Sequence, residues 1–332
     1  MSGKRKFEAF DASGHRFEVT EAVWREKVLP PLIKERWNDA DALAGVLHLA
    51  LNDGFFNEAL PGAEKLVELE PTSERAALVL ANTYWKLGRP DDSLRAVERF
   101  HARHAPTATS LAHLATLAQE RGDHDHAATL LWDALLLDPN NDKAANWWPL
   151  LERDRAGGGR DAHAAALRRL AELPGAWRAL VGLVRLDLDV KQIDGAIAHF
   201  EEALRRSPDA ETLLLTVSGD LGIAGRPGDA LRLVMPHYDS TRHDPLIGVN
   251  LVEAAIEIGD FELGQRLLER LNRLDRWDLK ERLRTCAGRS IRGGSRTTDP
   301  AIGSTNLYQA PHGRADSGLM HENPQRNDLP RD

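Results

Sequence analysis

Glycines, and one lysine, recur along this chain at a constant spacing of about 34 residues. The positions that share this spacing form two series: Gly54, Gly88 and Gly122, then Lys191, Gly225 and Gly259. The step from Gly122 to Lys191 is two periods and one extra residue. A fixed period of this length indicates a repeat protein, in which each unit buries its apolar face against the next.

Each period contains two helical patterns separated by a turn. The clearest unit is "SLAHLATLAQERGDHDHAATLLWDALLLDPNN", residues 110–141. Its small and aliphatic residues recur at helical spacing on both sides of Gly122: Leu111, Leu114, Ala115 and Ala118, then Ala127, Leu131 and Ala134. Pro139 ends the second pattern, because proline disfavours a helical conformation in the residue before it. The unit is therefore predicted to be a helix–turn–helix.

A small residue also recurs early in six of the seven predicted second helices. These residues are Ala59, Ser93, Ala127, Ala196, Ala230 and Gly264. Two helices pack closely where one side chain is small, and enlarging a residue in a filled core costs about 1–3 kcal/mol. The recurrence indicates that these six pairs pack in the same way.

The period, the small residues and the unit-ending proline resemble the tetratricopeptide repeat (TPR) family. The resemblance implies an all-α, right-handed superhelical solenoid of about seven units over residues 39–280, with turns near residues 54, 88, 122, 157, 191, 225 and 259. The motifs "LPGAWRAL", "SGDLG" and "DRWDLKE" also resemble a group of bacterial TPR proteins without an assigned activity.

The two ends of the chain differ from the repeats. The alternating runs "KFEAF" and "HRFEV" predict a β-hairpin, and Thr20 is the expected N-cap of a helix that Pro30 and Pro31 should kink or divide. Residues 1–38 should therefore cap the first repeat. Residues 281–332 lack a periodic apolar pattern and are predicted to be a disordered tail.

The run "RAGGGRDAH", residues 155–163, raises the question of a phosphate-binding loop. Such a loop needs a preceding strand or a following lysine, and this run has neither. Its glycines fall where the period expects a turn, so we predict a lengthened turn. Because Pro149 also lies in this fourth unit, we expect it to be the least regular joint of the array.

The predicted fold keeps the candidate catalytic and metal-binding residues apart. His124 and His126 lie at a turn, whereas His101 and His104 lie about 20 Å away at the opposite end of a helix, so they cannot share a metal ion. Cys286 falls in the predicted tail, without a rigid base beside it. We therefore expect no enzyme activity, no catalytic residue, no metal and no cofactor.

Charge and composition bear on partners and location. The net charge of −8 disfavours nucleic acid, which requires a concentrated basic surface, and the only basic cluster is the short run at residues 4–6. No apolar run is long enough for a membrane span, and a single cysteine is typical of a reducing compartment. These observations predict a cytoplasmic protein that binds neither nucleic acid nor membrane, and the arginine bias suggests a bacterial source.

Binding is expected on the concave face, which first helices line in repeat solenoids. Helical phase places ten residues there: His48, Asn82, Trp85, Lys86, His113, Thr116, Gln119, Glu120, Arg178 and Arg185. Asn82 is the one residue of the first three units that fits a TPR clamp for C-terminal carboxylates, so chaperone binding is not expected. The sequence favours a scaffold or adaptor for a protein partner. The alternatives are a regulatory receptor for a short peptide or small signalling molecule, and a non-catalytic accessory subunit of an enzyme complex.

Overall fold

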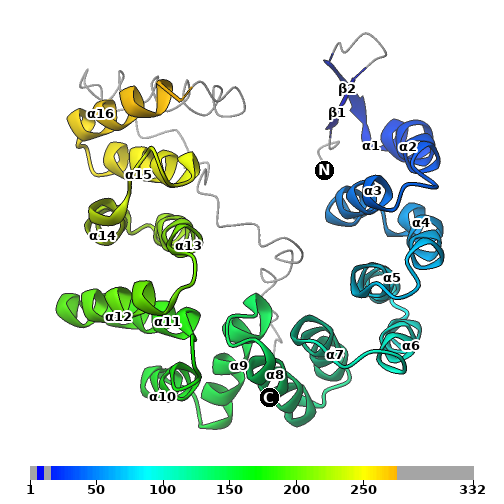
Figure 1. Ribbon diagram of the computed structural model, residues 1–332, viewed down its shortest axis with the longest axis horizontal. Coiled ribbons are helices and arrows are strands. Elements are labelled where there is room, and N and C mark those ends of the chain that lie inside the picture. The colour runs from blue at the N-terminus through cyan, green and yellow to red at the C-terminus, as the bar shows by residue number, and fades with distance from the viewer. Residues whose placement is uncertain (1–5, 11–15, 275–332) are drawn as a thin grey trace, which may run out of the picture. The chain divides into compact units, whose positions relative to one another are not determined.

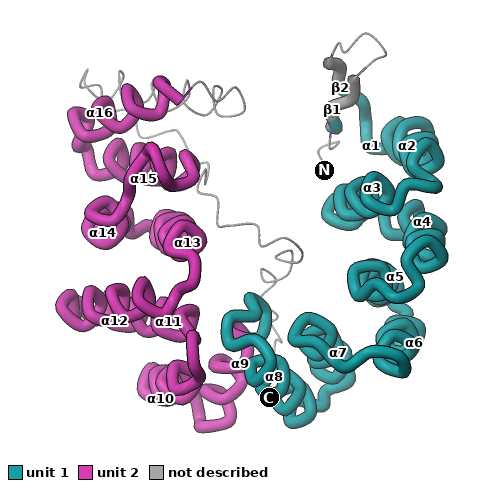
Figure 2. The backbone as a smooth tube through the Cα atoms, viewed as in Figure 1, with its two compact units in different colours: residues 1–144 teal, residues 145–332 magenta. Residues whose placement is uncertain are grey.

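The computed structural model describes residues 6–10 and 16–274. These residues form consecutive helices that follow one β-hairpin (Figure 1). The chain divides into two compact units, residues 1–144 and residues 145–332 (Figure 2). The predicted all-α fold of paired helices behind a hairpin is therefore confirmed. The predicted tail at 281–332, which includes Cys286, and the basic run at 4–6 except Lys6 lie outside the described residues.

The first unit begins with the hairpin. Strand β1 (Lys6–Phe10) pairs antiparallel with β2 (Arg16–Thr20), with Phe7 opposite Val19. The buried ring of Phe7 stacks on Trp24 at 5.3 Å and lies 5.3 Å from the ring of Phe55. The hairpin is thus attached to the first helix pair through its apolar face.

The segment after the hairpin is divided, as the sequence predicted. The Thr20 hydroxyl accepts a hydrogen bond from the Val23 amide and caps α1 (Glu21–Val23), which passes through a π-helical segment (Trp24–Val28) into α2 (Leu29–Glu35). Pro30 and Pro31 fall in the first turn of α2. Proline is tolerated there because amide groups in a first helical turn have no partner within the helix.

Three further helix pairs complete the first unit. They are α3 (Ala40–Asn52) with α4 (Phe56–Leu69), α5 (Glu74–Lys86) with α6 (Pro90–His101), and α7 (Ala108–Glu120) with α8 (His124–Leu137). Gly122 shows why the turns need glycine. Its φ is +79°, and the next amide, that of Asp123, donates to the Ala118 carbonyl at 3.0 Å. This is a left-handed helix ending, which glycine adopts without steric cost.

The recurring small residue lies at the seam within each pair. Ala59, Ser93 and Ala127 are each the fourth residue of their helices and are fully buried. In Figure 1, α3, α5 and α7 lie along one side of this unit, and α4 and α6 along the other. The small residues allow the helices of the two rows to pack closely.

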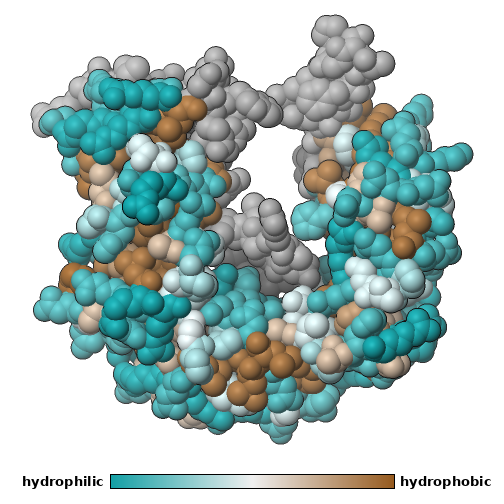
Figure 3. Space-filling view, viewed as in Figure 1, coloured by the Kyte–Doolittle hydropathy of each residue, from teal (hydrophilic) through white to brown (hydrophobic). Residues whose placement is uncertain are grey.

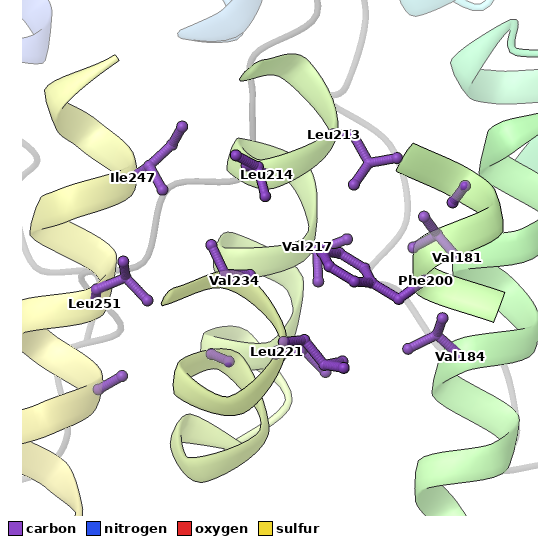
Figure 4. Packing of buried hydrophobic residues seen from close by; sticks show 14 of the residues in the cluster. Val181, Val184, Phe200, Leu213, Leu214, Val217, Leu221, Val234, Ile247 and Leu251 are labelled. Carbon is purple, nitrogen blue, oxygen red and sulfur yellow. The ribbon is translucent and has the colours of Figure 1, made fainter. Parts of the chain in front are cut away.

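The second unit contains the remaining pairs. They are α9 (Asp142–Arg155), whose first turn contains the unit boundary, with α10 (Arg160–Ala171), α11 (Trp177–Asp189) with α12 (Ile193–Arg206), α13 (Ala210–Ile223) with α14 (Pro227–Val234) and the 3₁₀ turn Met235–His237, and α15 (Pro245–Glu257) with α16 (Phe261–Asn272). Figure 4 shows the core of this unit, where Phe200 of α12 lies among aliphatic side chains of α11 and α13.

The triple glycine is a turn, and all three of its residues have a positive φ. Gly157, Gly158 and Gly159 have φ of +88°, +85° and +88°, and they join α9 to α10. Helix α9 continues through Pro149. The lengthening also shifts the packing register, because the fourth residue of α10 is His163, where six other second helices have alanine, serine or glycine.

Candidate functional site

The predicted groove residues fall into two sets. Eight lie in the first unit: His48 on α3, Asn82, Trp85 and Lys86 on α5, and His113, Thr116, Gln119 and Glu120 on α7. Arg178 and Arg185 lie on α11 in the second unit. The visible surface of each unit is mostly hydrophilic, with separate apolar patches (Figure 3). Binding at these ten positions remains a prediction, and their contacts show which of them lie together.

Trp85 is the centre of the first set. Its half-exposed indole ring lies 4.3 Å from the Nζ atom of Lys86, a cation–π contact. The indole N–H donates to the carboxylate of Glu120, which joins the ends of α5 and α7. The structure thus brings three of the predicted residues together.

His113 lies beneath this ring and is largely covered. Its imidazole meets the Trp85 ring edge-on at 6.4 Å and shares a 2.9 Å hydrogen bond with the buried Ser93 hydroxyl of α6. Only 8% of its surface is exposed. Burial, with a smaller effect of the Lys143 ammonium, lowers the pKa of His113 to about 3, so the ring is neutral at physiological pH. Helical phase predicted the face towards which His113 points, but it did not predict that the Trp85 ring covers the imidazole.

Lys143 belongs to the same surface, although it is not among the ten residues that helical phase predicted. From the first turn of α9 its Nζ atom donates to the Thr116 hydroxyl at 2.5 Å, and the same atom lies 6.0 Å from the Trp85 ring centroid. Thr116 is consequently only 9% exposed. The repeat spacing could have indicated this position. Lys143 occupies the same place in its repeat as Thr109 and Arg75, which lie one and two periods earlier.

His48 and Gln119, also predicted in the first unit, have local partners. His48 Nε2 lies 3.0 Å from the Asn52 side-chain amide, one turn along α3. Gln119 contacts His124 at 2.8 Å across the α7–α8 turn. Asn82 is half-buried on α5. His48 and Gln119 thus contact Asn52 and His124, and neither contact involves Trp85.

In the second unit, the two predicted arginines have separate contacts. Arg178 lies over the ring of its neighbour Trp177, at 4.6 Å from the centroid. Arg185 forms an ion pair with Asp220, which links α11 to α13. Arg185 therefore acts in the packing of successive first helices as well as on their surface.

A buried carboxylate on α11 is a further polar feature that the sequence did not reveal. Asp187 Oδ2 lies 2.8 Å from His199 Nδ1 of α12, and Arg160 of α10 lies 3.6 Å from its other oxygen. A Cβ atom at Gly195 would lie 2.8 Å from the Asp187 carboxylate, so glycine makes room for it. The contacts tie three helices together and have the character of a structural anchor.

The described residues contain neither a candidate metal site nor a helix that could span a membrane. Within residues 6–10 and 16–274, no three or more histidine, cysteine, aspartate or glutamate side chains form a group that could hold a metal ion. His101 lies 2.8 Å from the Ser110 hydroxyl, and His104 stacks on Phe100. In the same part of the chain, no helix has both the length and the apolar character of a membrane span.

The family model for the tetratricopeptide repeat matches residues 107–137, which contain α7 and α8. No curated protein matches the chain significantly.

The solved structures that match this chain share little sequence with it. MamA is 22% identical over 47% of this chain and 91% of its own, with a TM-score of 0.31. YrrB, described as a TPR protein with an unusual peptide-binding site, is 17% identical over 55% and 94%, with a TM-score of 0.33. PilW, a type IV pilus biogenesis factor, is 15% identical over 75% and 98%, with a TM-score of 0.34.

The segment that matches the family model is part of a wider pattern in this chain. The matched segment is one of a series of helix pairs with a left-handed residue in the turn, and in every pair except α9 with α10 the fourth residue of the second helix is small. Residues 107–137 thus form a tetratricopeptide repeat unit, and the other helix pairs resemble it in these features.

Proposed function

We propose that this protein is a scaffold or adaptor that holds a segment of a partner protein against the first helices of its repeats. TPR proteins in general bind protein or peptide partners and act as non-catalytic scaffolds. The observation that carries the proposal is the half-exposed Trp85 ring, with Lys86 over it and Glu120 on its indole N–H.

Trp85 and the residues that contact its ring have the composition of a binding hot spot. Tryptophan is enriched at interface centres because its ring buries a large area with few rotatable bonds. Here the ring is oriented by Glu120 and supported from below by His113, so little ordering is left for the binding step. The second unit repeats the combination of cation and ring at Arg178 and Trp177.

Charge supports a protein partner over nucleic acid or membrane. The chain has 43 basic and 51 acidic residues, and arginines of the first unit such as Arg75 and Arg121 form ion pairs with Asp41 and Asp91. Nucleic-acid affinity depends on many unneutralised cations. The proposal places the protein in the cytoplasm, which a single cysteine favours, and gives it no catalytic step of its own.

Affinity capture from the native cell tests the proposal. The bait is the full chain, beside the double variant Trp85→Ala with Lys86→Glu and a control, Lys65→Glu, on the opposite row of helices. Truncating a hot-spot tryptophan costs about 2 kcal/mol or more, so the double variant should lose partners that wild type and control retain. Equal capture by all three baits, with equal thermal stability, would show that another surface binds.

A further inference from the structure

Two ammonium groups from different repeats lie on the same tryptophan ring. Lys86 reaches Trp85 from the next position on α5, with Nζ 4.3 Å from the ring centroid. Lys143 reaches it from the start of α9, with Nζ 6.0 Å from the centroid, while it donates to the Thr116 hydroxyl. We call the five residues Trp85, Lys86, Thr116, Glu120 and Lys143 the Trp85 site.

The charges of the Trp85 site sum to a positive value within an acidic protein. Lys86 and Lys143 contribute two positive charges and Glu120 one negative charge, whereas the whole chain has a net charge of −8. His113 adds no charge, since its burial beneath the ring keeps it neutral. Glu120 already accepts from the Trp85 indole N–H, so its carboxylate is directed at the ring.

We propose that the Trp85 site binds an acidic peptide segment of the partner, with an aspartate or glutamate side chain against Lys86 and Lys143 and a neighbouring apolar side chain on the Trp85 ring. The inference rests on the proposed function and names the chemistry of the segment. A carboxylate fits because ammonium groups donate strong, charge-assisted hydrogen bonds to it. A basic side chain would meet two like charges at this ring.

The same surface fits a nucleic acid less well. Tight binding of a phosphate backbone neutralises many phosphates at once, and the site presents two cations beside a carboxylate. A short peptide needs one or two charge contacts and one apolar contact, which is what the Trp85 site supplies. Lys143 acts here as a specificity residue, because it brings the second positive charge from a neighbouring repeat.

Selection from a library of random short peptides displayed on phage tests the inference. The immobilised target is the full chain, as wild type, as Lys86→Gln with Lys143→Gln, or as the control Lys34→Gln with Lys65→Gln, which makes the same change in net charge on α2 and α4. One selected peptide is then synthesised, together with its Glu→Gln and Asp→Asn form, and titrated by calorimetry. A fluorescent oligouridylate is titrated into the same proteins.

Wild type and control should enrich acidic peptides, and the Lys86→Gln, Lys143→Gln variant should not. In titration, each lost lysine contact should weaken the acidic peptide by about fivefold and leave its amide form unchanged. Enrichment of peptides without acidic residues, or an acidic preference that survives in the variant, would overturn the inference while supporting peptide binding. No enrichment by any target would overturn the proposed function as well. Oligouridylate binding that depends on the two lysines would assign the site to nucleic acid and overturn the inference.

Discussion

Gly248 of α15 offers a sharp test of the packing described for the second unit. An added Cβ atom would overlap the hydroxyl oxygen of Tyr238 and lie 2.8 Å from Cδ2 of Leu271. Tyr238 follows the 3₁₀ turn after α14, and burial raises its pKa to about 12, as expected for a hydroxyl held inside the protein. Gly248→Ala therefore inserts a methyl group into filled space between α15, α16 and the α14–α15 connection.

Two opposing effects set the size of the change. Overpacking of a filled core costs about 1–3 kcal/mol. Replacing glycine by alanine within a helix recovers up to about 1 kcal/mol. We therefore expect Gly248→Ala to lower the free energy of unfolding by about 1–2 kcal/mol, measured by urea denaturation followed by circular dichroism.

A matched glycine in the first unit separates these effects. Gly45 lies inside α3, and an added Cβ atom there would meet nothing within 4 Å. Gly45→Ala should therefore stabilise the protein by about 0.5–1 kcal/mol through helix propensity alone.

A double variant tests the assigned cause. Tyr238→Phe removes the closest atom and leaves Leu271 in place, so it should restore part of the loss in Gly248→Ala, with a coupling of about 0.5–1.5 kcal/mol. If Gly248→Ala behaves like Gly45→Ala, or if Tyr238→Phe restores nothing, the packing assigned to this seam is wrong.

Two further predictions concern a turn and a buried imidazole. Lys191 has a φ of 60° where neighbouring repeats have glycine, so Lys191→Gly should raise the urea midpoint by an amount equivalent to about 0.5 kcal/mol, whereas Lys191→Ala, which keeps the left-handed strain, should not. The folded-state pKa of His113 is about 3, below the usual 6.5, so the unfolded chain takes up its proton first as the pH falls. Stability should therefore decrease from about pH 6.5 towards pH 3, with a contribution of up to about 1.4 kcal/mol per pH unit. Urea titrations of wild type and His113→Gln at several pH values should show a shallower decrease in the variant, and equal slopes would contradict the assignment.

The repeat turns were predictable because a left-handed backbone strongly selects glycine. A residue with φ near +80° after a helix end is sterically costly for any side chain, so glycines mark these positions in the sequence. The spacing also located Lys191, which composition alone would not have identified as a turn residue. Its amide environment is the same as at Gly122, since the following amide, that of Gln192, donates back to the Asp187 carbonyl at 2.9 Å.

The fourth helix pair, α9 with α10, shows what the repeat spacing alone cannot predict. The step from Gly122 to Lys191 exceeds two periods by one residue, and the glycine run indicated where that extra residue lies. It did not show which residue would enter the seam. Because α10 begins at Arg160, its fourth residue is His163, and the buried alanine is Ala164, one position later. Burial and two nearby arginines lower the pKa of His163, so the changed register brings an ionisable group towards the packed interface.

The sequence predicted towards which face the residues of the candidate site point, but it did not predict how exposed each side chain is. Helical phase turns Trp85 and His113 towards the same face, but exposure depends on which side chain lies on top. Trp85 covers His113 from the preceding first helix, and Lys143 covers Thr116 from the following one. In a stacked array, cover thus comes from residues about one repeat away, which the pattern within a single helix cannot report.

Because Trp85 is the covering residue and His113 the covered one, substitutions of the two should affect binding and stability differently. Trp85 presents its ring at the surface, so its truncation should act mainly on partner affinity. His113 lies under that ring and on Ser93, so its replacement should act mainly on the free energy of unfolding and on its pH dependence. If His113→Gln weakened partner binding as much as Trp85→Ala while leaving stability unchanged, the imidazole would itself contact the partner. The assignment of Trp85 as the covering residue would then be wrong, even with the repeat fold intact.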